Sequence, residues 1–133
     1  MLNFRLLIRV VTVIYALAIA GIVWCASAGW YRPTFGLVQS YVSDKWLHFM
    51  LVGVLTLLLN LSLNLAAVSH RTKWLLWGTS LMLVLATLEE ASQFWISNRT
   101  LDVSDLACNY LGILIIGHLP WLIPRSAGLN TEH

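Results

Sequence analysis

Four long apolar runs alternate with short polar segments along the chain, at about residues 10–28, 46–68, 74–96 and 103–123. Each run is long enough to cross a bilayer as an α-helix, which needs about 20 predominantly apolar residues. A helix also satisfies its own backbone hydrogen bonds, which lipid cannot do. The pattern therefore predicts an all-α integral membrane protein, a four-helix transmembrane bundle that forms a single domain over residues 1–133.

The composition agrees with a membrane protein, because 59% of the residues are hydrophobic and only 11% are charged. Soluble domains use roughly 45 to 50% apolar and about 25% charged residues. The formal net charge of +2 comes from scattered basic residues, which argues against nucleic acid as a partner. Cys25 and Cys108 are too few for a disulfide framework and have no metal-binding spacing. We therefore expect the lipid bilayer as a partner, with no cofactor and no metal.

Charges next to the apolar runs predict the orientation of the bundle, because Lys and Arg are enriched in short cytoplasmic segments. One side of the predicted bundle carries Arg5, Arg9, Arg71, Lys73 and Arg125. The other side carries Arg32, Lys45 and Arg99. Both termini are therefore expected in the cytoplasm, and the segment that joins the third and fourth runs is expected outside.

Acidic residues gather on the predicted outer side, where Glu89, Glu90, Asp102 and Asp105 make up four of the six in the chain. Three separate segments meet there, and their polar residues are Asp44, Lys45 and His48, then Glu90 and Gln93, then Arg99, Asp102, Asp105 and Asn109. Spacings of three and four place such residues on one face of a helix. Ionised residues at membrane depth face the bundle interior and pair with one another. The pattern predicts an outward-facing polar site.

Two neighbouring glutamates compete for a place in this site. Adjacent residues point about 100° apart on a helix, so only one of the two is expected beside Gln93. We assign Glu90 to that place and leave Glu89 open between the site and the headgroup region. His118 has no acidic neighbour in sequence and is interpreted as structural, and Asn60 and Asn64 are expected to pack against Thr79 or Ser80.

The ordered motifs resemble those of the VanZ-like family of small polytopic membrane proteins. They read D-K-x-x-H, E-x-x-Q and R-x-x-D-x-x-D-x-x-x-N-x-x-G, and are carried by Asp44, Lys45, His48, Glu90, Gln93, Arg99, Asp102, Asp105, Asn109 and Gly112. The resemblance covers about residues 44–117. It implies a multi-pass protein of the bacterial cell membrane, in the cell envelope, with a part in antibiotic resistance to glycopeptides, teicoplanin in particular.

Three functions fit the polar set. The leading hypothesis is binding of an anionic or glycosylated envelope component. In it Lys45 and Arg99 donate, Glu90, Asp102 and Asp105 hold them, and His48, Gln93 and Asn109 contact the ligand. The first alternative is a membrane enzyme that acts on a lipid-linked substrate, with His48 or Glu90 as general base. The second is a structural membrane partner in which the polar residues only join helices. A metal site built from His48, Glu90, Asp102 and Asp105 is disfavoured because Lys45 and Arg99 compete for the same carboxylates.

Overall fold

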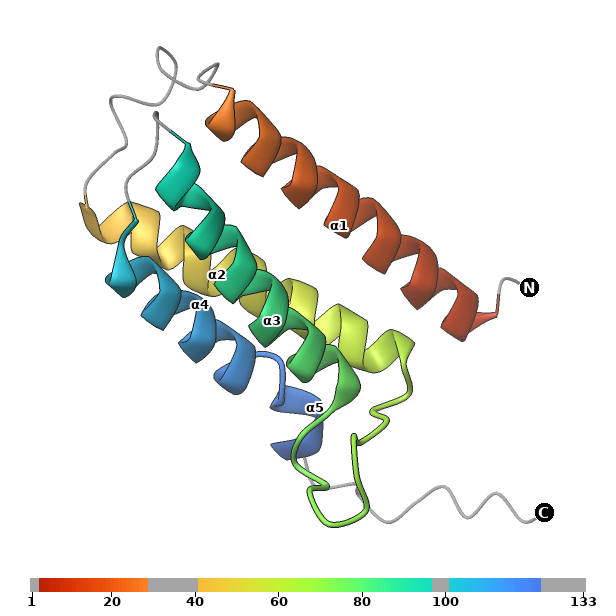
Figure 1. Ribbon diagram of the computed structural model, residues 1–133. Coiled ribbons are helices and arrows are strands. Elements are labelled where there is room, and N and C mark those ends of the chain that lie inside the picture. Colours follow the sequence, from red (N-terminus) through yellow and green to blue (C-terminus); the bar gives the residue numbers. More distant parts are fainter. Residues whose placement is uncertain (1–2, 29–40, 97–100, 123–133) are drawn as a thin grey trace, which may run out of the picture.

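The computed structural model describes residues 3–28, 41–96 and 101–122, and within these ranges the side chains of residues 26, 41–44 and 122 are left out. The described chain is all helical, and its only strand-like pairing is an isolated bridge between Ala67 and Leu76. The elements are α1 (Phe4–Ser27), α2 (Tyr41–Ser62), α3 (Trp77–Ser92), the 3-10 helix η1 (Gln93–Trp95), α4 (Val103–Ile115) and α5 (Leu119–Leu122), as Figure 1 shows.

Three stretches of the described chain are long and apolar enough to cross a membrane, namely Phe4–Cys25, Lys45–Ser62 and Val103–Trp121. Only 6% of the first stretch is buried inside the molecule, so α1 presents large apolar side chains such as Leu17 almost all round. Soluble monomers rarely expose apolar patches of that extent, whereas lipid solvates them. The fold is therefore compatible with a membrane protein.

The ends of three predicted runs differ from the helices. The run 46–68 ends at Ser62, because Asn64 and Leu65 adopt φ values of 55° and 57° and start a turn. The run 74–96 contains only the 16 residues of α3, since Leu76 is extended and the chain tightens into η1 at Gln93. The run 103–123 breaks between α4 and α5, next to Gly117 and before Pro120.

Helix α2 is the centre of the packing, and it contacts α4 more extensively than it contacts α1 or α3. Glycines allow this close approach: a Cβ atom on Gly112 would overlap the backbone carbonyl of Phe49, and one on Gly53 would crowd Ile116. Small residues at a helix crossing are the usual way in which membrane helices bring their backbones together. The α2–α4 pair is therefore the rigid part that positions the polar residues.

Buried polar side chains lie at both ends of this pair. At the end near α5, the amide of Asn60 accepts the backbone N–H of Thr79 at 3.1 Å and donates to the Thr79 hydroxyl and the Gly117 carbonyl at 3.0 Å each. The predicted contact of Asn60 with Thr79 is confirmed. Asn64 is exposed in the turn after α2, so its predicted packing role is wrong.

The other end of the bundle is formed by the start of α2, the end of α3 and the start of α4 (Figure 1). We call it the charged end, and define it by Lys45, Glu90, Asp102 and Asp105. The described residues of the three sequence motifs lie at or next to this end.

Candidate functional site

Lys45 is the centre of the charged end. Its Nζ donates to Asp105 Oδ1 at 2.6 Å and to Asp102 Oδ2 at 3.1 Å, with 16% of its side chain exposed. Lys45 lies near the start of α2 and both aspartates lie near the start of α4, so the ion pairs join these two helices. Charged groups that are largely removed from water are stable when they are paired in this way.

Asp102 is also the N-cap of α4. Its Oδ1 accepts the backbone N–H of Ser104 at 2.8 Å and the Ser104 hydroxyl as well. A capping carboxylate satisfies one of the backbone donors that the first turn leaves open, which explains why α4 begins here. The Ser104 hydroxyl first, then Lys45 and the Ser104 backbone N–H, lower the pKa of Asp102 from 3.8 to about 2. Asp102 is therefore ionised at neutral pH.

Glu90 connects α3 to α4. The residue is 2% exposed, and its Oε1 accepts the backbone N–H of Asp102 at 2.8 Å while its Oε2 accepts a hydrogen bond from Gln93 Nε2 at 3.2 Å. The same Gln93 nitrogen also donates to Glu89 Oε1 at 3.1 Å. The prediction that only one glutamate lies beside Gln93 is therefore wrong. The angle between Glu89 and Glu90 was not decisive, because Gln93 follows them by four and three residues and both spacings make neighbours on a helix.

His48 lies one turn beyond Lys45 on α2, beside the ion pairs. Its Nδ1 donates to the amide oxygen of Asn109 at 3.2 Å, and its Nε2 lies 3.7 Å from Asp105 Oδ2. Asn109 is 2% exposed and sits one turn after Asp105 on α4. The imidazole is thus oriented by one amide and one carboxylate, and both belong to the same face of α4.

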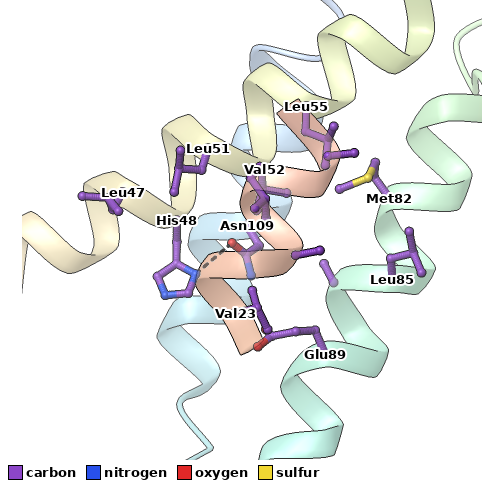
Figure 2. A pocket seen from close by; sticks show the side chains of 14 residues that line it. Val23, Leu47, His48, Leu51, Val52, Leu55, Met82, Leu85, Glu89 and Asn109 are labelled. Atoms are coloured by element: carbon purple, nitrogen blue, oxygen red, sulfur yellow. Dashed lines mark hydrogen bonds between the residues drawn. The ribbon is translucent and has the colours of Figure 1, made fainter. Parts of the chain in front are cut away.

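An apolar cavity of about 320 Å³ begins at His48 and is partly open to the outside. Four helices line it, with Ala16, Ile19, Ala20 and Val23 from α1, Leu47, His48, Leu51, Val52 and Leu55 from α2, Met82, Leu85, Ala86 and Glu89 from α3, and Asn109 from α4. Only three of these residues are polar, namely His48, Glu89 and Asn109. Figure 2 shows the hydrogen bond of His48 with Asn109, Glu89 close to Val23, and Leu55 with Met82 farther along the cavity.

Seven of the nine predicted site residues have described side chains, and the structure brings these seven together at one end of the bundle. They are Lys45, His48, Glu90, Gln93, Asp102, Asp105 and Asn109. The side chain of Asp44 and the whole of Arg99 lie outside the described residues. Within the described residues no group of three His, Cys, Asp or Glu side chains is close enough to hold a metal ion, and Cys25 and Cys108 are free thiols.

Sequence reasoning left Glu89 open between the site and the headgroup region, and it missed the contribution of α1. Glu89 follows Leu85 by four residues and Ala86 by three, so it shares the helix face that lines the cavity. That spacing was visible in the sequence and pointed to the interior. The α1 residues carried no such signal, because Ala16 and Ala20 stand in an apolar run without a polar marker.

Fold and site together define the class: an all-helical protein, three of whose described stretches are long and apolar enough to cross a membrane, with a paired charge cluster at one end. No family model, curated protein or solved structure matches the chain. Its function has to be inferred from the site residues and the motifs that they form.

Proposed function

We propose that the chain is a VanZ-like protein of the bacterial cell membrane that binds a glycosylated envelope component and raises tolerance to glycopeptides, teicoplanin in particular. It would cross the membrane four times, with both termini in the cytoplasm and the charged end outside. The ordered motifs support the family, and the gathering of their described residues at one end supports a common site.

The observation that carries this proposal is the position of His48 and Asn109, between the charged end and the apolar cavity. The remaining contacts of the charged end are structural: Lys45 joins α2 to α4, and Glu90 joins α3 to α4. Interhelical packing alone is therefore enough to explain Lys45 and Glu90. His48, Asn109 and Glu89 differ, because they also line a space large enough for part of a ligand.

The polar groups that line the cavity suit a sugar. They are the imidazole of His48, the carboxylate of Glu89 and the amide of Asn109. Hydroxyl groups can donate to carboxylates and amide oxygens and accept from an imidazole or amide N–H. A hydroxyl-rich head group therefore fits this lining.

A second candidate function is catalysis on a lipid-linked substrate, with His48 as general base. The contact of His48 Nε2 with Asp105 beside the cavity favours it, because a carboxylate next to an imidazole is a common arrangement in acid–base catalysis. Glu90, the other candidate base, is unsuited, since it is buried and holds the backbone N–H of Asp102.

The test is the minimal inhibitory concentration of teicoplanin in a sensitive host that expresses the parent or a variant at matched membrane levels. We expect the parent to raise this concentration, and we expect His48→Gln and Asn109→Leu to reduce the gain to a similar extent. Leu88→Val, at an exposed position of α3, is the control and should retain it.

Other results lead elsewhere. Loss of the gain with His48→Gln alone favours catalysis, because a general base is irreplaceable whereas an orienting amide is only helpful. Full gain in both variants shows that the polar residues serve packing only. A parent that fails to raise the concentration contradicts the glycopeptide role.

A further inference from the structure

The cavity beside His48 is apolar along its length and polar at one place. It extends along α2 from Leu47 to Leu55, eight residue-to-residue steps, which correspond to about 12 Å at the rise of an α-helix. Its volume of about 320 Å³ lies at the small end of the roughly 300 to 1,000 Å³ of ligand pockets. A space of this length with an almost wholly apolar lining suits a single hydrocarbon chain better than a sugar ring.

Helix α1 keeps this cavity open. It turns Ala16 and Ala20 toward it, and neither side chain is large enough to fill the space. The hydroxyls of Thr12 and Tyr15 donate to the backbone carbonyls of Leu58 and Leu51, both at 3.3 Å, and hold α1 against α2. The cavity extends along α2 from Leu47, near the charged end, to Leu55.

Apolar lining alone cannot select a ligand in a membrane. Lipid tails are as apolar as leucine side chains, so moving a tail from the bilayer into the cavity gains little free energy. Selection has to come from the polar groups that the ligand meets beside the tail. Those groups are the imidazole of His48, the carboxylate of Glu89 and the amide of Asn109, and all three can form hydrogen bonds with hydroxyls.

We propose that the cavity binds the hydrocarbon chain of a glycolipid, while the sugar head of the same molecule contacts His48, Glu89 and Asn109. The inference rests on the proposed function and specifies its ligand class, a sugar linked to a single inserted chain. It also gives α1 a role, because α1 supplies one wall of the chain site.

The test uses three synthetic probes with the same decyl chain and a diazirine photocrosslinker near the chain terminus. One probe has a glucose head, one a phosphate head and one only a hydroxyl. Each is added to the purified protein in phosphatidylcholine nanodiscs, and crosslinked peptides are identified by mass spectrometry. We expect the glucoside to label peptides that contain Leu51, Val52 or Met82, and to do so more strongly than the other two probes.

Two alanines of α1 provide a matched pair of variants. Ala20→Phe fills the cavity, whereas Ala18→Phe places the same ring on an exposed position that does not line it. We expect Ala20→Phe to reduce glucoside crosslinking by about tenfold or more, the scale on which apolar pockets discriminate by size, and Ala18→Phe to leave it unchanged. Ala16→Leu narrows the same cavity and should give a partial loss if Ala20→Phe fails to fold.

Each contrary result has its own meaning. Equal crosslinking by the three probes shows adventitious bulk lipid only and overturns the chain site. Glucoside crosslinking that Ala20→Phe and Ala16→Leu leave intact also overturns the chain site. Stronger crosslinking by the phosphate probe overturns the glycolipid class and, with it, the sugar head of the proposed function. The glycopeptide role is judged separately by the teicoplanin measurement.

Discussion

Asp105 contacts both the ion pair of Lys45 and the cavity residue His48, because its two carboxylate oxygens face different partners. Oδ1 accepts from Lys45 at 2.6 Å, and Oδ2 lies 3.7 Å from His48 Nε2. The side chain is 13% exposed, so little water is available to replace either partner. Asp105 thereby couples the structural ion pairs to the residues that line the cavity.

Asp105→Asn is expected to destabilise the protein more than Asp102→Asn. The first change places a neutral amide between Lys45 and His48 in a largely buried position. The second leaves a side chain that is 38% exposed and still able to cap α4, since Asn caps helices as well as Asp. The measurement is thermal unfolding of the two purified variants in detergent, and equal melting temperatures would contradict the central role of Asp105.

The low pKa of Asp102 predicts how stability depends on pH. A carboxyl group whose folded pKa is about 2 and whose unfolded pKa is near 3.8 contributes stability above pH 3.8. That contribution is lost as the pH falls through 2, when the folded state also takes up the proton. The difference in melting temperature between the parent and Asp102→Asn should therefore be constant from about pH 5 to 8 and shrink below pH 3.8.

Ser104→Ala is the companion variant, because the Ser104 hydroxyl is the largest cause of the lowered pKa. It should move the loss of stability toward higher pH. An unchanged pH profile in Ser104→Ala would show that Lys45 and the backbone N–H of residue 104 are enough to hold the pKa low.

At the scale of elements, the contact between α2 and α4 depends on glycines, which have no functional side chain. Gly112 of α4 lies against the Phe49 carbonyl of α2, whereas Gly21 of α1 has no atom within 4 Å of an added Cβ. We expect Gly112→Ala to destabilise the protein by about 1 to 3 kcal/mol, as overpacking does. Gly21→Ala should be neutral or should stabilise by up to about 1 kcal/mol through helix propensity. Unfolding in mixed detergent micelles measures both, and equal stability would place the α2–α4 crossing elsewhere.

The sequence predicted the helices better than their ends, and the reason is physical. Hydropathy reports which residues lipid can solvate, and Leu63, Leu65 and Val68 are as apolar as the helix before them. It does not report the positive φ values at Asn64 and Leu65 or the hydrogen bond from the Val68 N–H to the Leu75 carbonyl. These features end α2 at Ser62 without any change in composition.

At the scale of the whole molecule, the orientation in the membrane stays a prediction from the charges. Single cysteines at Asn98 and Thr131, on a background without Cys25 and Cys108, test it in intact cells with a membrane-impermeant thiol reagent. Asn98→Cys should be labelled and Thr131→Cys should be protected until the cells are broken. The reverse pattern would invert the topology and place the charged end in the cytoplasm.

The polar part of the site was predictable because spacing on α2 and α4 brings Lys45, His48, Asp105 and Asn109 onto facing stripes. The cavity was not, since it depends on how α1 and α3 lie against that pair. A small residue such as Ala20 can lie in close contact with a neighbouring helix or can border a cavity, depending on how the helices pack. Only the assembled bundle decides between the two.

The short length of α3 has a consequence for the surrounding bilayer. Its 16 residues extend about 24 Å, against a hydrocarbon thickness of about 30 Å. If α3 crosses the membrane as proposed, lipids beside it have to shorten or the helix has to recruit polar residues at its ends, at a cost of a fraction of a kcal/mol per Å of mismatch. The leaflets would be compressed along the flank on which α3 borders the cavity. Membrane thickness would then influence both where the protein resides in the cell and how readily a lipid chain leaves the bilayer for its interior.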